Sequence, residues 1–169
     1  MDTNTANATQ VKTMFEKVVE FNKSFGVKLA ETPNREIFTK DPKLVDYRMS
    51  LIQEEFTELQ DAVKAHDFVE TIDALTDIMY VTLGMFTALG VDADKAYDIV
   101  HSSNMSKLCK TEEEAIETVE NYKKNDDRYD SPAYRKSDDG NYYVVYNEST
   151  GKILKSIRYT PANFESIIN

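Results

Sequence analysis

Two stretches of this chain carry carboxylates at helical spacing, and carboxylate oxygens are the ligands that hard divalent cations prefer in proteins. The first stretch reads Glu-Glu-x-x-Glu and the second reads Glu-x-x-Asp-x-x-x-Asp. Their members are Glu54, Glu55 and Glu58 in the first stretch and Glu70, Asp73 and Asp77 in the second. Six carboxylates in two short segments would repel one another unless a cation neutralised them, so the pattern predicts metal binding.

The first stretch belongs to a predicted helix over about Tyr47 to Lys64. At about 100° per residue, Glu58 lies about 40° and Glu55 about 100° from Glu54. The three glutamates therefore border the apolar stripe of this helix and lie away from the arc of Gln, Thr and Lys side chains that water should cover. We expect them to face inward.

The second stretch begins a predicted helix over about Phe68 to Leu89, whose second half from Ile78 to Gly90 holds no charged residue. A helix that is apolar on nearly all sides is expected to be buried. Asp77 and Glu70 lie within about 60° of Asp73 on this helix, which makes a narrow acidic strip. Ionised carboxylates in a poorly solvated strip are strongly unfavourable without a counterion. Magnesium fits, because it takes oxygen ligands and keeps sites open for substrate phosphates.

Other readings of the acidic residues are weaker. Acidic residues on helices are often only solvated, but the arc positions and the charge-free run argue against that here. A calcium loop with its central glycine is absent from the sequence. A carboxylate di-iron bundle would need Glu-x-x-His pairs, and neither His66 nor His101 follows a glutamate at that spacing.

At these residues the sequence resembles the all-α nucleoside triphosphate pyrophosphohydrolases, the superfamily of MazG-type enzymes, dimeric dUTPases and phosphoribosyl-ATP pyrophosphohydrolase. The family signature is Glu-Glu-x-x-Glu followed downstream by Glu-x-x-Asp. The first half matches literally, whereas the second half has two registers: Glu70 with Asp73, or Asp77 with Asp73 one position early. We favour Asp77 and Asp73, with Glu70 as a third ligand or a supporting group.

The resemblance extends over about Val11 to Leu108 and includes three further motifs. These are Glu20-Phe21-Asn22-x-x-Phe25-Gly26, Tyr80-Val81-x-Leu83-Gly84 and His101-x-x-Asn104-Met105-Ser106-Lys107. The resemblance implies an all-α helical bundle that hydrolyses a nucleoside triphosphate to the monophosphate and pyrophosphate. It also implies magnesium as the cofactor, with manganese as a substitute, bound by the six carboxylates.

The resemblance and the residue types together give roles to individual side chains. Glu55, at the far edge of the arc from Glu54, is our candidate general base. By resemblance, Asn104 and Lys107 contact the substrate, with Lys107 at the phosphates. Asn22 lies beside aromatic residues and could hydrogen-bond a base, although ordinary packing explains it as well. Further substrate contacts are expected from two lysines near the C-terminus, Lys152 and Lys155.

Three regions are expected along the chain. Residues 1–10 read as a disordered tail, residues 11–124 as the all-α pyrophosphohydrolase domain, and residues 125–169 as a loop and a β-hairpin packed on that domain. The polar stretch from Asn125 to Gly140 is expected to be a mobile loop that can act as a lid. The hairpin is expected to pair Tyr142–Tyr146 with Ile153–Ile157.

Composition limits the classes of function and partner. The chain has 169 residues, with 30 acidic and 20 basic side chains and a net charge of −10, so nucleic acid and anionic membranes are poor partners. A single cysteine, Cys109, excludes an intramolecular disulfide, and no stretch was expected to reach the length of a membrane-spanning helix. We therefore expect a cytoplasmic protein that forms a homodimer to cover its apolar second helix. The alternatives are a non-catalytic helical module that binds metal or docks a partner, and a phosphoribosyl-ATP pyrophosphohydrolase.

Overall fold

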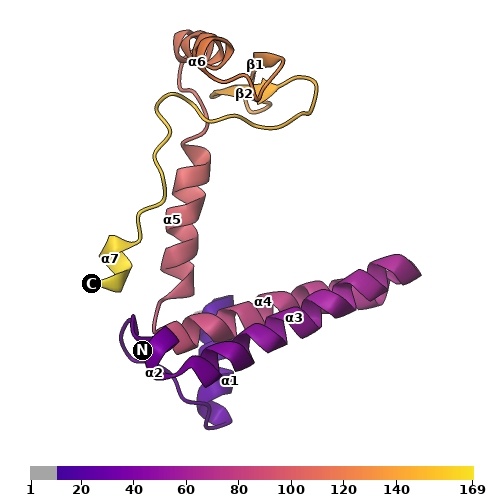
Figure 1. Ribbon diagram of the computed structural model, residues 1–169, viewed down its shortest axis with the longest axis vertical. Helices are drawn as coiled ribbons and strands as arrows, with labels where there is room; N and C mark the ends of the chain where they lie inside the picture. Colours follow the sequence, from indigo (N-terminus) through magenta and orange to yellow (C-terminus); the bar gives the residue numbers. More distant parts are fainter. Residues whose placement is uncertain (1–10) are drawn as a thin grey trace, which may run out of the picture. The chain divides into compact units, whose positions relative to one another are not determined.

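The computed structural model describes residues 11–169, and the expected tail at residues 1–10 lies outside this range. The chain divides into two compact units (Figure 1). The first contains the residues up to Ala96 together with Glu165–Asn169, and the second contains Tyr97–Phe164. The division falls within helix α5 (Ala93–Met105). The described residues are mostly helical with a two-stranded antiparallel sheet, so the predicted all-α fold with a small hairpin is confirmed.

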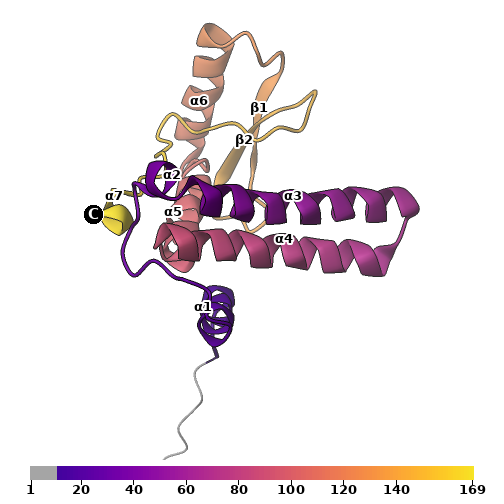
Figure 2. The ribbon, with the colours of Figure 1, turned by 60° about the horizontal axis from the view of Figure 1, so that its bottom comes forward.

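The first unit is built on two long helices, α3 (Pro42–Ala65) and α4 (Phe68–Leu89), which lie side by side in both views (Figures 1 and 2). His66 ends α3 in a left-handed conformation with φ 57°. The Asp67 side chain then caps α4 by accepting hydrogen bonds from two backbone N–H groups. This short connection makes the two helices antiparallel neighbours, which brings the two acidic stretches of the sequence to facing helices.

Helix α1 (Met14–Ser24) packs on α4 and starts with a capping box between Thr13 and Glu16. Its buried Asn22 donates a 2.9 Å hydrogen bond to Thr87 Oγ1 on α4. The segment expected as a loop between Glu31 and Asp41 contains the short helix α2 (Ile37–Lys40). A further short helix, α7 (Glu165–Ile168), also belongs to this unit, where the carbonyl of Ile168 accepts from Arg35.

The expectation that α4 is buried is not met within a single chain. Large apolar side chains of α4 remain exposed, among them Ile72, Leu75 and Met79. The reason is that the described chain offers α4 only two substantial helical neighbours, α3 and α1. Much of its apolar circumference is left uncovered.

Helix α4 also corrects the expectation that no stretch reaches the length of a membrane span. By length and composition alone, Phe68–Leu89 is long and apolar enough to cross a membrane, and it is the one such helix found among residues 11–169. The sequence estimate missed it because three carboxylates interrupt its first half. Core helices of water-soluble proteins meet the same two criteria, so this finding assigns no location.

In the second unit, helix α6 (Glu112–Asn125) packs against strands β1 (Pro132–Lys136) and β2 (Tyr143–Asn147). Thr111 caps α6 by accepting from the Glu114 backbone N–H. The core of this unit combines side chains from α6, from the residues just before it, from β2 and from the segment after β2. Its buried members are Cys109, Ala115, Val119, Val145 and Leu154.

The strand at Tyr143–Asn147 forms as predicted, but it pairs with an earlier segment and not with Ile153–Ile157. Strand β2 pairs with β1, whose residues fall inside the stretch expected to be an irregular loop, and that expectation is wrong for Pro132–Lys136. The segment at Ile153 makes only an isolated bridge to Tyr146. It leaves the sheet because Ser156 turns away to contact Glu114 of α6, and the backbone N–H of Ile157 donates to Thr118 of α6.

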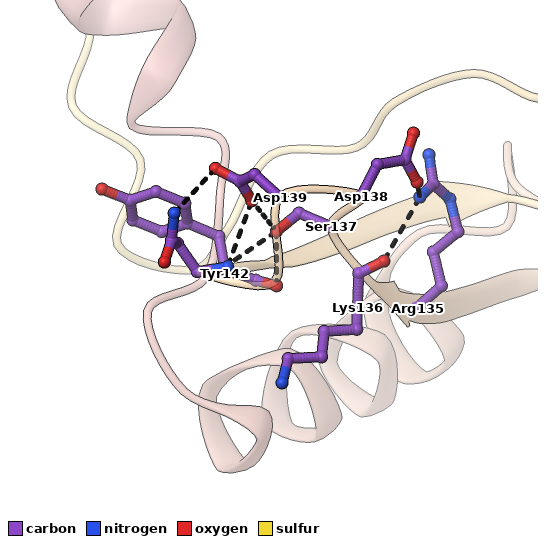
Figure 3. Close-up of polar contacts among 7 residues, drawn as sticks. Arg135, Lys136, Ser137, Asp138, Asp139 and Tyr142 are labelled. Atoms are coloured by element: carbon purple, nitrogen blue, oxygen red, sulfur yellow. Dashed lines mark hydrogen bonds and ion pairs between the residues drawn. The ribbon is translucent and has the colours of Figure 1, made fainter.

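The turn between the two strands is held by side chains (Figure 3). Asp139 accepts hydrogen bonds from the Ser137 hydroxyl and from the Asn141 backbone N–H. Arg135 pairs with Asp138 at 2.9 Å across the same turn. These local contacts order residues that their polar composition alone had suggested were irregular.

Helix α6 therefore belongs with the hairpin, whereas the sequence had suggested a boundary at residues 124 and 125. Its buried face is covered by β1, by β2 and by the segment around Leu154. In the structure residues 97–124, which the sequence had suggested as part of the helical domain, lie in the second unit together with the hairpin.

Candidate functional site

Four carboxylates of α3 and α4 act electrostatically on a fifth, Glu55 of α3. The pKa of Glu55 is raised above its ordinary value, first by partial burial and then by the negative charges of Glu58, Asp77, Glu54 and Asp73. The two aspartates belong to α4, so the repulsion crosses from one helix to the other. The structure therefore brings together the two acidic stretches that lie apart in the sequence.

The antiparallel pairing of α3 and α4 brings Asp77 close enough for its charge to act on Glu55. Both are half-buried, in contrast to Glu54, Glu58 and Asp73, which are exposed. Of the acidic residues of α4, Asp77 and Asp73 influence Glu55, as the favoured register of the motif requires. Glu70 is exposed near the start of α4 and is not among the charges that raise the pKa of Glu55. Its role as a ligand stays a prediction.

The acidic residues are more open to water than the sequence had suggested. Three of the five are exposed, so the strip lies at the edge of the helix pair and not inside it. Among residues 11–169, no three Asp, Glu, His or Cys side chains converge closely enough to hold an ion as they stand. The donor set is nevertheless all carboxylate oxygen from two adjacent helices, which suits magnesium chemically. A cation would also relieve the repulsion that raises the pKa of Glu55.

One residue of this helix pair was missed by the sequence reasoning. Arg48 of α3 is buried, and its guanidinium lies against Gly84 of α4. The signal was present in the sequence, because Arg48 precedes Glu55 by seven residues and so lies about 20° from it on the helix. An arginine in an apolar arc should have been noted alongside the acidic residues.

The aromatic residues near Asn22 form a cluster on α1 and α4. The rings of Phe21 and Phe25 stack at 4.3 Å, and Tyr80 meets Phe21 edge-on at 5.7 Å. All three rings are exposed to some extent, whereas Asn22 is buried and its amide donates to Thr87. Asn22 therefore supports the packing of α1 on α4, and contact with a nucleobase stays a prediction for it.

The other predicted substrate contacts lie in the second unit. Lys107 Nζ donates a 2.7 Å hydrogen bond to Asn104 Oδ1, so these two residues lie together as their motif suggested. Lys152 Nζ lies 5.1 Å from the centre of the Tyr129 ring, and Lys155 Nζ lies 4.3 Å from that of Tyr159. Both lysines are exposed. Their contact with a substrate is untested.

Comparison with known proteins places these residues in a family. The chain is 28% identical to an uncharacterized protein of Acanthamoeba polyphaga mimivirus, and the match covers 98% of each chain. A family model described as phosphoribosyl-ATP pyrophosphohydrolase matches residues 18–104, which include α3, α4 and the five coupled carboxylates. This match spans more than half of the chain. It supports a pyrophosphohydrolase that acts on a nucleotide, and the chain belongs to the phosphoribosyl-ATP pyrophosphohydrolase family, within the all-α nucleoside triphosphate pyrophosphohydrolases.

Proposed function

We propose that this protein hydrolyses a nucleoside triphosphate to the monophosphate and pyrophosphate with magnesium bound at the carboxylates of α3 and α4. The observation that carries the proposal is the repulsion of Glu55 by four other carboxylates from two facing helices. Such repulsion destabilises the metal-free protein, and it is the arrangement expected where a doubly charged ion binds. The family match supports the reaction class.

Under this proposal the carboxylates have two roles, metal binding and proton acceptance. Glu54, Glu58, Asp73 and Asp77 would hold the ions, which when bound supply charge neutralisation for the phosphates and acidify water. Glu55 would accept the proton of the attacking water. A carboxylate next to a metal-bound water is a suitable acceptor for that proton. Water and the triphosphate are consumed, and the monophosphate and pyrophosphate are released.

The neutral amide of Asn104 and the ammonium of Lys107 suit a nucleotide. Their mutual hydrogen bond orients the lysine. Lys152 and Lys155 are further candidate contacts with phosphate, each held over a tyrosine ring.

A second copy of the chain is the proposed partner of the first unit. Helices α3 and α4 expose large apolar side chains that a lone helix pair cannot cover: Met49, Phe56, Val63, Phe68, Ile72, Leu75 and Met79. Exposed apolar surface on this scale indicates an interface, and two such pairs would make a four-helix bundle. A homodimer is therefore expected in solution.

Phosphoribosyl-ATP is the second candidate substrate, and the description of the matching family favours it. Both substrates release pyrophosphate, so the product alone does not separate them. The non-catalytic alternative, a helical module that stores metal or docks a partner, releases no pyrophosphate at all.

The test is a panel of canonical and modified nucleoside triphosphates together with phosphoribosyl-ATP, assayed for pyrophosphate with magnesium, manganese or calcium. We expect magnesium-dependent release with nucleoside triphosphates, reduced by orders of magnitude in Asp77→Asn. Asp61→Asn is the matched control, because Asp61 is an exposed residue of α3 that pairs with Lys64 at the surface. Wild-type turnover by Asp77→Asn would refute the ligand assignment, and absence of release with every substrate would favour the non-catalytic module.

A further inference from the structure

Arg48 is a buried cation with two unpaired nitrogens. The residue is 6% exposed, and among residues 11–169 its Nε and Nη2 find no acceptor. Buried polar groups in folded proteins are nearly always paired, and a buried charge without a partner is strongly unfavourable. An arginine kept in this state indicates that another molecule supplies the acceptor.

The two unpaired nitrogens point to the kind of acceptor. Nε and Nη2 donate from the same edge of the planar guanidinium, so their N–H groups run parallel as a fork. Such a fork matches two adjacent acceptor atoms, as on a phosphate group or on the edge of a nucleobase. A lysine at this position could not make the paired contact.

Gly84 of α4 makes room for the guanidinium. A Cβ built on Gly84 would lie 2.9 Å from Arg48 Nη1, closer than real Cβ contacts allow. The side chain of Arg48 therefore occupies the space that a larger residue at Gly84 would fill. The third nitrogen, Nη1, lies next to α4, and the unpaired edge is left for a ligand.

Arg48 lies on the same face of α3 as Glu55, and Gly84 lies on the same face of α4 as Asp77. Arg48 precedes Glu55 by seven residues, and Gly84 follows Asp77 by seven residues on the antiparallel helix. Seven residues are two turns, or about 10.5 Å along the axis. A nucleotide held by ions at the carboxylates could extend along α3 far enough to reach the guanidinium.

We propose that Arg48, seated against Gly84, binds a pair of adjacent acceptor atoms on the nucleotide. This proposal rests on the proposed function. The acceptors belong either to a phosphate group or to the base edge. The fork is covered in the ligand-free chain, so the side chains over it must shift as the substrate enters.

The experiment measures binding by titration calorimetry with magnesium and two probes, a non-hydrolysable α,β-imido nucleoside triphosphate and inorganic tripolyphosphate. Arg48→Lys keeps the charge without the fork, and Arg48→Met removes both. Lys43→Met is the matched control, because Lys43 is an exposed cation at the start of the same helix. We expect both Arg48 variants to lose at least about tenfold in nucleotide affinity and the control to lose none.

The tripolyphosphate probe separates the two sources of acceptor. If Arg48 contacts a phosphate, affinity for tripolyphosphate falls by a similar factor, whereas a base contact leaves it unchanged. The melting temperature of the protein without added nucleotide distinguishes a structural role of Arg48 from a role in binding. Arg48→Met should keep or raise it, since an unpaired buried charge is removed. Gly84→Ala crowds the guanidinium, so it should weaken nucleotide binding as the two Arg48 variants do.

Two results would overturn the proposal. One is unchanged nucleotide affinity in both Arg48 variants while the wild type binds the nucleotide with magnesium, which leaves the proposed function standing. The other is a lower melting temperature or loss of the dimer in Arg48→Met, which would make Arg48 a structural residue. If the wild type itself binds no nucleotide, this inference falls together with the proposed function.

Discussion

Replacing Glu55 by glutamine should stabilise the metal-free protein at neutral pH. Like charges one helical turn apart cost about 0.2–0.5 kcal/mol, and four neighbouring carboxylates act on Glu55. Allowing for solvent screening at this half-exposed edge, removal of one charge should recover about 1 kcal/mol. For a chain of this length that corresponds to a rise of about 2–4 °C in melting temperature.

The pH dependence of stability follows from the direction in which the pKa of Glu55 is shifted. The pKa of Glu55 is raised above 4.5, so the folded protein holds this proton to a higher pH than the unfolded chain does. Stability is therefore lost as the pH rises from about 4.5 through the raised pKa, and the loss is complete above it. Glu55→Gln should exceed the wild type in stability at pH 7.5 and match it at pH 4.

Thermal unfolding in EDTA and in 100-fold excess of magnesium over its dissociation constant would measure both effects. Magnesium should stabilise the wild type by about 2.7 kcal/mol under those conditions. Magnesium should stabilise Glu55→Gln less, so the difference in melting temperature between the two proteins should shrink or change sign. Glu120→Gln, the same change at an exposed position of α6, should alter neither measurement. A variant that is less stable than the wild type in EDTA at pH 7.5 would refute the reasoning.

Three further substitutions test the fold. Gly90→Ala should destabilise the first unit by about 2 kcal/mol or more in denaturant titration, because φ is 68° and a Cβ would lie 2.0 Å from the Thr32 carbonyl oxygen; a neutral effect would mean that this close contact is absent. Glu114→Ala should cost about 1–3 kcal/mol in the same assay, because the buried carboxylate accepts from the Ser156 hydroxyl, and unchanged unfolding would contradict that bond. Hydrogen bonds lower the pKa of Asp130 to about 2, so its contribution should be present above about pH 4 and lost as the pH falls towards 2. Asp130→Asn should flatten that part of the acid unfolding curve, and an identical curve would contradict the assignment.

The carboxylates and the helices that carry them could be read from the sequence. The spacing of Glu54, Glu55 and Glu58 needs only the period of an α-helix, and Phe68–Leu89 was predicted with the bounds that the structure has. Both depend on neighbours within one or two turns. The pairing of the two helices also followed, because a connection as short as the one at His66 leaves antiparallel packing as the ordinary outcome.

Contacts between distant segments decided the rest. The sequence indicated Ile153–Ile157 as the partner of Tyr142–Tyr146. In the structure Ser156 contacts Glu114 of α6 instead, and β2 pairs with β1. The burial of Asn22 depends on Thr87, which lies 65 residues away. The unpaired state of Arg48 depends on what α4 places opposite it. A sequence pattern specifies the local period and face of an element, whereas the identity of the group that meets that face is fixed only when remote parts of the chain pack together.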